Sequence, residues 1–233
     1  MFSINEVKDI IKELKKSKYC YVSEAHIQLQ FAIVGNNLFK NAFEFVPEYP
    51  GITNIAGVDK KTEFDLLVVD KETQEKTLIE FKYKTRNATD KSKRTLFPTY
   101  LGTDIALANH SAHDLNRYDC WWDIYRIESN VKSGTFTNGF FIFVTNEYLY
   151  KDEDGSGTLS VTKDPKMFSL KKGYHKATVK TVDDKLDPKT AGAFRIKNPI
   201  NILNDYDFNY ELFQDFNLPK DDKFWSLIVP IKE

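Results

Sequence analysis

Two short apolar runs, residues 64–69 and 77–83, constrain the fold of this chain more than any other feature. Each run is rich in aliphatic, β-branched and aromatic residues, which is typical of β-strands. Every residue between 70 and 75 is charged or polar, a composition that favours a turn. The pattern predicts a β-hairpin, and the register of a hairpin determines which residues face each other.

The predicted register places two carboxylates opposite each other. The turn has its midpoint between Glu72 and Thr73, so an evenly folded hairpin pairs residues whose numbers sum to 145, including Asp65 and Glu80. Their Cβ atoms would lie roughly 4.5–5.5 Å apart, close enough for like charges to repel. Lys82 shares a face with Glu80 because side chains alternate along a strand. The compensating charge is therefore expected from Lys82 or from a divalent cation.

These residue types suit a hydrolytic site that uses a metal ion. Two converging carboxylates match the oxygen-ligand preference of Mg²⁺, which keeps several waters and bridges to phosphate. An ammonium group beside the ion can position the attacking water or take part in proton transfer. The pattern thus indicates metal-assisted hydrolysis of phosphodiesters. A surface hairpin in which Lys82 only neutralises nearby acids explains the same residues, because charged side chains usually mark a solvated face.

A known group of enzymes carries a similar pattern. Asp65, followed by Glu80-x-Lys82 at the end of a hairpin, resembles the core signature of the PD-(D/E)XK nucleases, the restriction-endonuclease-like superfamily. A helix carrying Glu24 precedes the hairpin, and a long helix and a hydrophobic strand follow it, in the order seen in that superfamily. Phe64 occupies the place of the signature proline, a departure that bears on recognition more than on mechanism.

The resemblance implies an α/β fold. Its core would be restriction-endonuclease-like, a mixed β-sheet flanked by helices in the order αβββαβ, over about residues 20–147. A C-terminal elaboration would occupy about residues 151–233, which are first polar and then aromatic. Because the chain has no internal repeat and no convincing linker, residues 1–233 are expected to form a single nuclease-like domain.

The resemblance also implies roles for individual residues. Asp65, Glu80 and the backbone carbonyl of Phe81 would hold Mg²⁺, for which Mn²⁺ can substitute. Lys82 would orient or activate the attacking water, and Glu24 would support a water ligand of the metal or a second ion. The implied activity is that of a metal-dependent endonuclease. DNA is expected as the substrate because it is the commonest in the superfamily, and restriction or anti-phage defence suits a small chain.

Hydrophobic patterning predicts the elements around the hairpin. Residues 4–16 carry an apolar stripe at helical spacing, and Ser23 is a suitable N-cap for a second helix that ends near Leu38. Residues 42–49 are predicted to form a strand, after which Pro50-Gly51 turns the chain.

The elements after the hairpin follow from the same kind of pattern. No glycine or proline interrupts residues 103–131, which predicts a long helix. Its expected core face consists of Leu115, Tyr118, Trp122 and Tyr125. Residues 139–146 are almost continuously apolar, as in a central strand, and the helical connection makes this strand parallel to that of Glu80. Residues 224–230 predict a final strand.

A cluster of basic residues adjoins the predicted site. The whole chain has a formal net charge of -1, so binding to nucleic acid would have to use a local patch. Residues 82–94 contain six lysines and arginines against one aspartate, a local net charge of +5. Their expected phosphate contacts are Lys84, Arg86, Lys91, Lys93 and Arg94. A solvated loop is the alternative explanation.

The cysteine count and the apolar segments of the chain bear on its cellular compartment. Cys20 and Cys120 are too few for a disulfide framework and lack metal-site spacing, so reduced thiols in a cytoplasmic protein are expected. Residues 1–18 contain no continuous apolar segment, and no stretch is long enough to predict a membrane span. The resemblance implies nucleic acid as the partner, no membrane partner is expected, and a homodimer remains open.

Other side chains are weaker candidates for the site. The alternative acids are Glu44, Glu48 and Glu63. A metal site from His110, His113 and Asp114 is not expected, because no second ligand pair accompanies them. Arg117 and Arg126 lie in a stretch that resembles some bacterial members of the superfamily, where they can contact phosphate, but ion pairs of Arg126 with Asp119 or Asp123 explain them as well.

Three alternative functions remain open from the sequence. The first is a nuclease for RNA or for branched or damaged DNA. The second is a non-catalytic nucleic-acid-binding module that retains the fold and uses its basic loop. The third is a protein-interaction module with the aromatic C-terminal region as its surface. Dependence on a metal ion distinguishes the enzymes from the binding module.

Overall fold

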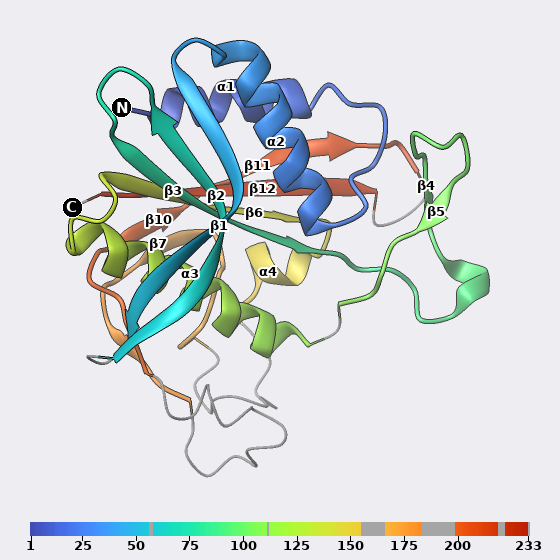
Figure 1. Ribbon diagram of the computed structural model, residues 1–233. Helices are drawn as coiled ribbons and strands as arrows, with labels where there is room; N and C mark the ends of the chain where they lie inside the picture. Colours follow the sequence, from blue (N-terminus) through green and yellow to red (C-terminus); the bar gives the residue numbers. More distant parts are fainter. Residues whose placement is uncertain (56–57, 111, 155–165, 183–198, 219–221, 233) are drawn as a thin grey trace.

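The computed structural model describes residues 1–55, 58–110, 112–154, 166–182, 199–218 and 222–232 (Figure 1). The helices are α1 (Ile4–Leu14), α2 (Glu24–Phe39), α3 (His113–Lys132), α4 (Tyr148–Asp152) and the short 3-10 helix η1 (Lys91–Lys93). The longer strands are β1 (Phe43–Ile55), β2 (Val58–Asp70), β3 (Lys76–Lys84), β6 (Asn138–Thr145), β11 (Tyr210–Asp215) and β12 (Lys223–Ile231). The shorter strands are β4 (Leu96–Phe97), β5 (Ile105–Ala106), β7 (Gly173–His175), β8 (Val179–Lys180), β9 (Ile200–Asn201) and β10 (Tyr206–Phe208).

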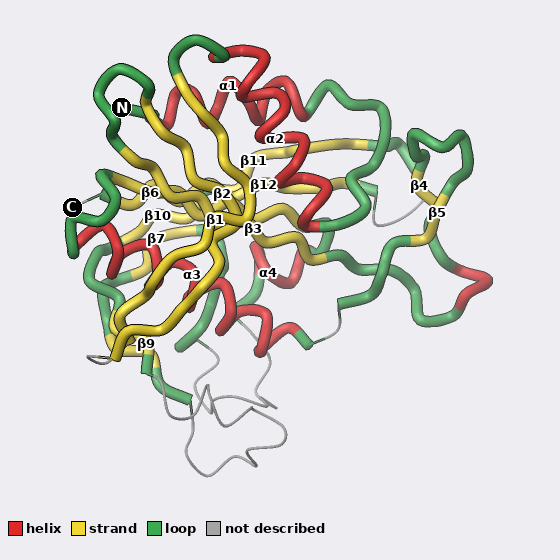
Figure 2. The backbone as a smooth tube through the Cα atoms, viewed as in Figure 1, coloured by secondary structure: helices red, strands yellow, loops and turns green. Residues whose placement is uncertain are grey.

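A six-stranded mixed sheet forms the centre of the molecule, with strand order β1-β2-β3-β6-β12-β11. Strands β3 and β6 are parallel, and the other neighbours in this sheet are antiparallel. Helices α1 and α2 cover one face and α3 covers the other (Figures 1 and 2). The predicted α/β class, with a mixed sheet flanked by helices, is therefore confirmed. Strand β12 pairs directly with β6, so the C-terminal segment extends the same sheet.

The sheet separates two hydrophobic cores. Under α1 and α2, Phe31, Phe81 and Ile142 belong to one buried cluster. Under α3, Trp121 and Phe141 belong to the other. Every residue of β6 is buried, because the strand supplies alternate side chains to both cores. The predicted central strand and its parallel pairing with β3 are confirmed.

The hairpin between β2 and β3 has the predicted register. Its paired residues run from Val69 with Lys76 to Leu66 with Ile79, and each pair sums to 145. This pairing stops at Leu66 and Ile79, so Asp65 and Glu80 occupy the next position, where the two strands diverge. The two carboxylates therefore lie where β2 and β3 separate, which we call the fork in the sheet.

The predicted turn at Pro50-Gly51 is wrong, because β1 continues through it to Ile55. Strand β1 is an edge of the sheet, where the missing N–H of a proline can face solvent instead of a neighbouring strand. Gly51 is needed for a different reason. A Cβ at this position would lie 2.3 Å from Cε2 of Phe64, so the ring occupies the space that a side chain would need.

The N-terminal helices match their predictions closely. Ser23 caps α2 as expected, since its Oγ accepts a hydrogen bond from the His26 N–H at 3.1 Å.

No helix in the described ranges has the length and apolar character needed to cross a bilayer. Cys20 and Cys120 are both free and buried, as predicted.

Helix α3 differs from its prediction in start and in orientation. It begins at His113 instead of near residue 103, because Ile105–Ala106 pair with β4. Tyr118 of the predicted core face is fully buried, whereas Leu115, Trp122 and Tyr125 are only partly buried. Trp121 and Ile124, outside the predicted face, are fully buried as well. The C-terminal segment explains the difference, since β9 and β10 help cover α3 and bury residues on more than one of its faces. A single apolar stripe was therefore a poor guide to its core face.

Candidate active site

Asp65, Glu80 and Lys82 meet where β2 and β3 separate, at the N-terminal end of α2. The Phe81 N–H donates to Asp65 Oδ2 at 2.6 Å, which fixes one carboxylate against the backbone of β3. Glu24, the first residue of α2, accepts from the Tyr83 N–H at 2.9 Å. Its other oxygen lies 3.6 Å from Lys82 Nζ. The structure thus brings together all four residues predicted to be catalytic.

Helix α3 adds two charged residues, Asp123 and Arg126, of which the sequence suggested only Arg126, as a weaker candidate for phosphate contact. Asp123 Oδ2 lies 2.7 Å from Lys82 Nζ. Arg126 Nη2 lies 3.0 Å from Glu80 Oε1, and Arg126 Nη1 lies 3.4 Å from Asp123 Oδ1. The ion pair of Arg126 with Asp123 within the helix is confirmed, but its contact with Glu80 was not foreseen. The one available signal was the spacing of three residues, which places both side chains on one face of a helix.

These six residues form what we call the charged cluster: Glu24, Asp65, Glu80, Lys82, Asp123 and Arg126. Four carboxylates face two cationic groups, so full ionisation would leave an excess of two negative charges. The side chains of Glu80 and Asp123 are only 2% and 5% exposed. Among the described residues, neither Glu80 Oε1 nor Asp123 Oδ2 accepts a well-directed hydrogen bond, although each has a cationic group within ion-pair distance.

The electrostatics of the cluster favour uptake of a positive charge. Burial raises the pKa of Asp65 from its usual 3.8 to about 6, against the opposing effects of the Phe81 N–H and Lys82. Burial also raises the pKa of Glu80 well above its ordinary value, although Arg126 opposes the shift. Taking a carboxylate out of water disfavours its ionised form, which a proton or a cation relieves. The cluster therefore fits a bound cation.

Lys82 behaves in the opposite way. Burial lowers the pKa of its ammonium group, but the carboxylates of Asp123 and Glu24 outweigh this effect, so the pKa lies above its usual value. Lys82 Nζ also donates to the Phe81 carbonyl at 3.2 Å. The side chain is thus held as a cation and a hydrogen-bond donor at neutral pH.

Residues 62–64 of β2 contact the guanidinium of Arg126. Arg126 Nη2 donates to Thr62 Oγ1 at 2.8 Å and to the Glu63 carbonyl at 2.7 Å, and the guanidinium lies 5.1 Å from the centre of the Phe64 ring. Glu63 therefore contributes its backbone to the site. Its carboxylate, proposed as an alternative acid, belongs to an exposed residue.

The other alternative acids lie on the edge strand. Glu44 pairs with Val69, four positions from Asp65, and is exposed. Glu48 is also exposed, and its backbone adopts the left-handed region with φ of 51° where β1 passes Asp65. Neither residue joins the charged cluster in the contacts described above.

The cluster does not contain a complete set of protein ligands for a metal ion. In the described part of the chain, no three His, Cys, Asp or Glu side chains are arranged to hold a metal together. Mg²⁺, however, is commonly held by one or two carboxylates and completes its shell with water and substrate. Asp65, Glu80 and the Phe81 carbonyl can supply such a partial set at the fork, provided that Glu80 exchanges its contact with Arg126 for the ion.

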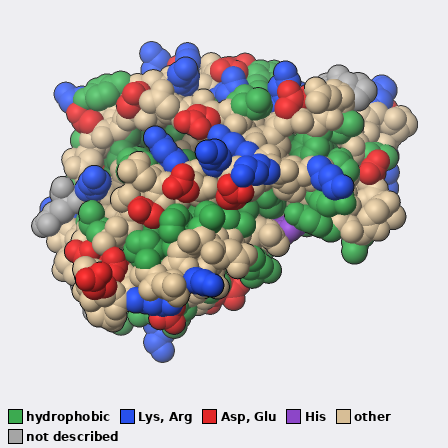
Figure 3. Space-filling view, turned by 90° about the horizontal axis from the view of Figure 1, so that it is seen from above, with side chains coloured by type: hydrophobic (Ala, Val, Ile, Leu, Met, Phe, Trp, Pro, Cys, Tyr) green, Lys and Arg blue, Asp and Glu red, His purple; other side chains and the backbone are tan. Residues whose placement is uncertain are grey.

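The predicted phosphate-binding residues divide into two groups. Arg86 Nη1 lies 3.1 Å from the buried carboxylate of Glu147, and Arg94 Nε donates to the Ala88 carbonyl at 3.1 Å. Both arginines therefore support the loop that carries them. Lys91 and Lys93 are exposed at η1, while Lys84 is half-buried at the end of β3. On the face of the molecule seen in Figure 3, basic and acidic side chains are intermingled.

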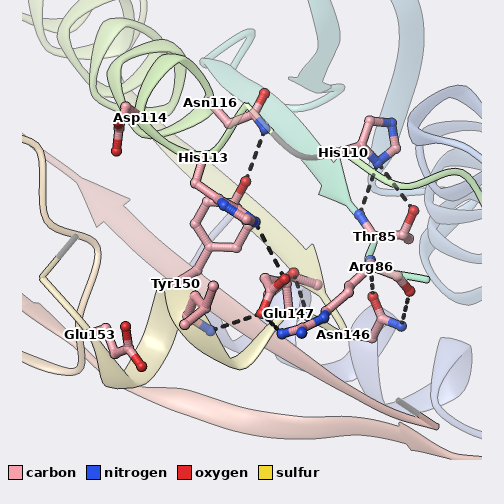
Figure 4. Close-up of polar contacts among 12 residues, drawn as sticks. Thr85, Arg86, His110, His113, Asp114, Asn116, Asn146, Glu147, Tyr150 and Glu153 are labelled. Carbon is pink, nitrogen blue, oxygen red and sulfur yellow. Dashed lines mark hydrogen bonds and ion pairs between the residues drawn. The ribbon is translucent and has the colours of Figure 1, made fainter. Parts of the chain in front are cut away.

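The histidines near α3 belong to a second polar cluster, at the carboxyl ends of β3 and β6 (Figure 4). His113 Nε2 lies 3.3 Å from Glu147 Oε2, and His110 Nδ1 accepts from the Thr85 N–H at 3.0 Å. Asp114 lies 3.6 Å from Arg117. Each of the three residues thus has a different partner in this cluster.

No protein-family model matches the chain, and no curated protein or solved structure is significantly similar to it. The geometry and electrostatics of the charged cluster are therefore the observations that bear on function.

Proposed function

We propose that this protein is a metal-dependent endonuclease of the restriction-endonuclease-like type, acting on DNA. The observation that carries the proposal is the meeting of Asp65, Glu80 and Lys82 at a fork in the sheet, where, within the described ranges, Glu80 Oε1 accepts no well-directed hydrogen bond. The order α2-β1-β2-β3-α3-β6 also supports it, since it follows the αβββαβ order of that superfamily. Restriction or anti-phage defence is the setting we propose for this activity.

Each residue has a role that follows from its surroundings. Asp65, Glu80 and the Phe81 carbonyl would hold Mg²⁺, which when bound supplies positive charge beside the scissile phosphate and acidifies a water molecule. Hydrolysis forms a bond from the water oxygen to phosphorus and breaks the bond to the 3′ oxygen. Lys82, held as an ammonium group, would donate hydrogen bonds that orient the water or stabilise the developing phosphorane charge.

Two residues position Lys82 from opposite faces of the sheet. Glu24 approaches from α2 and Asp123 approaches from α3, so the ammonium group is confined between two carboxylates. Such confinement reduces the orientational freedom that a flexible lysine would otherwise lose during the reaction. We therefore assign Glu24 and Asp123 as positioning residues for Lys82.

One observation favours a second candidate, a nucleic-acid-binding module without catalytic activity. The ion pairs of Arg126 with Glu80 and of Lys82 with Asp123 already neutralise part of the cluster. If these pairs persist when Mg²⁺ is present, the acids are structural and the exposed lysines at η1 carry the binding.

A cleavage assay distinguishes the two candidates. Supercoiled plasmid, linear duplex, single-stranded DNA and RNA are incubated with Mg²⁺ or Mn²⁺, and the products are separated by electrophoresis. The wild type should cut DNA, whereas Asp65→Ala, Glu80→Ala and Lys82→Ala should each abolish cutting, because the residues of one catalytic unit act together. Glu63→Ala is the matched control, since it removes an exposed acid from the same strand. Equal cutting by all variants would contradict the proposed site, and binding without cutting would favour the module.

A further inference from the structure

A cavity of about 600 Å³ lies beside the charged cluster, between the β1–β2 hairpin and the C-terminal end of α3. A cavity of this size falls within the range of small-molecule sites in proteins. Its lining residues are Tyr49, Pro50, Gly51, Ile52, Phe64, Lys76, Ser129, Asn130, Ser133, Thr135 and Phe136. All of them lie in the described part of the chain.

The lining combines aromatic rings with neutral hydrogen-bonding groups. Phe64 and Phe136 form an edge-to-face pair with ring centres 5.6 Å apart and are only 1% and 3% exposed, so the half-buried Tyr49 is the most accessible of the three rings. The polar side of the cavity comes from Ser129 and Asn130, together with further hydroxyl groups of the α3 C-terminus. Hydroxyl and amide groups both donate and accept hydrogen bonds, so this side suits a planar ligand with a mixed polar edge.

The cavity and the charged cluster share a wall. The Phe64 ring lines the cavity, and the guanidinium of Arg126, which contacts Glu80, lies 5.1 Å from the centre of that ring. Along α3, Ser133 follows Arg126 by seven residues, which corresponds to about 10 Å of helix. Along β3, Lys76 precedes Glu80 by four residues, or roughly 13 Å. The wall formed by Phe64 therefore adjoins the cluster, and the cavity extends from this wall toward Ser133 and Lys76.

We propose that this cavity receives one unstacked nucleobase of the substrate strand, next to the phosphate that is cleaved. The proposal deepens the proposed function and rests on it for the identity of the strand. An aromatic ring such as Tyr49 can stack on the face of any base, and the serine and threonine hydroxyl groups can bind its polar edge. Lys76 at the cavity supplies a cation for a neighbouring phosphate.

Binding of single nucleotides tests the cavity without relying on cleavage. Each deoxynucleoside monophosphate is titrated into the full-length protein in EDTA, and saturation-transfer NMR reports contacts of the base protons. Deoxyribose 5-phosphate is the matched ligand that lacks a base. The wild type should bind at least one nucleotide and should not bind the sugar phosphate comparably.

Two variants alter the cavity in different ways. Ser129→Trp fills it from α3 and should weaken nucleotide binding by roughly 5- to 150-fold, the range expected for loss of base–aromatic stacking. Ile52→Asp places a charge at its edge, where Ile52 is 57% exposed, and tests the same cavity if the tryptophan prevents folding. Melting curves identify the folded variants.

The outcomes separate this proposal from the proposed nuclease activity. Nucleotide binding that is lost in the folded cavity variants supports the base site, even if the wild type cuts no nucleic acid. Absence of nucleotide binding to the wild type, or binding that both variants leave unchanged, overturns the base site. In that case DNA cleavage that still depends on Glu80 would leave the proposed nuclease function standing.

Discussion

Replacing Asp65 with Asn should remove a specific pH dependence of stability. The pKa of Asp65 rises from 3.8 to about 6 on folding, with burial as the main cause. Because one pKa unit corresponds to 1.36 kcal/mol, the difference amounts to up to about 3 kcal/mol. An acid whose folded pKa is raised holds its proton more tightly in the folded state. Its stabilising contribution is therefore complete below about pH 3.8 and is lost as the pH rises through about 6.

Urea unfolding, followed by tryptophan fluorescence between about pH 4 and pH 7, measures this effect. The free energy of unfolding of the wild type should fall relative to Asp65→Asn by up to about 3 kcal/mol across this range, or about 6–12 °C in melting temperature. Asn can still accept the hydrogen bond of the Phe81 N–H, so the fold should be retained. Glu63→Gln, an exposed site on the same strand, serves as the control.

Mg²⁺ should change this pH dependence in a defined direction. An ion that binds the ionised carboxylate stabilises the folded state by mass action, by about 2.7 kcal/mol when its concentration is 100 times the dissociation constant. Proton and metal compete for the same oxygens, so the stabilisation by Mg²⁺ should grow between about pH 5 and pH 7. A stability difference between wild type and Asp65→Asn that stays constant with pH, with and without Mg²⁺, would refute the reasoning.

Three further predictions follow from other contacts. Glu128→Ala should lower the free energy of unfolding by about 3 kcal/mol in urea melts, because the buried carboxylate accepts hydrogen bonds from two backbone N–H groups and a tyrosine hydroxyl; Glu128→Gln should cost less. Arg126→Met should cost about 3–5 kcal/mol at neutral pH by leaving Glu80 unpaired, whereas the double variant with Glu80→Leu should recover most of that loss. Lys91→Ala with Lys93→Ala should reduce the slope of log affinity against log salt by up to about 1.8 on duplex DNA, measured in Ca²⁺, and an unchanged slope would remove these lysines from the interface.

Short-range sequence patterns were sufficient to predict the part of the site that lies on the β2–β3 hairpin. A hairpin register depends on the turn and on a period of two, so the positions of Asp65 and Glu80 followed from counting residues. The N-cap Ser23 and the buried strand β6 depend on similarly local rules. These rules do not involve the rest of the chain, which is why they succeeded.

Other features of the site and fold could not be predicted, because they depend on contacts between residues far apart in the sequence. Arg126 reaches Glu80 only because α3 packs across β3, and the sequence gives no measure of that packing. The burial of α3 depends on β9 and β10, more than 60 residues later in the chain, so its apolar stripe was incomplete. Strand β1 passed through Pro50 because it lies at the sheet edge, a fact that only the strand order reveals.

The free-energy cost of burying the charged cluster indicates that the cluster has a function other than stabilising the fold. Taking several charged groups out of water costs free energy that their mutual attraction only partly offsets, so hydrophobic replacements of a buried ion pair are often neutral or stabilising. Lys82 lies between carboxylates from two helices on opposite faces of the sheet, an arrangement that carries this cost. Residues that reduce stability where packing would not require them are expected at sites of chemistry. The double variant of Arg126 and Glu80 tests this argument directly: recovery of stability together with loss of cleavage would show that the pair serves the reaction instead of the fold.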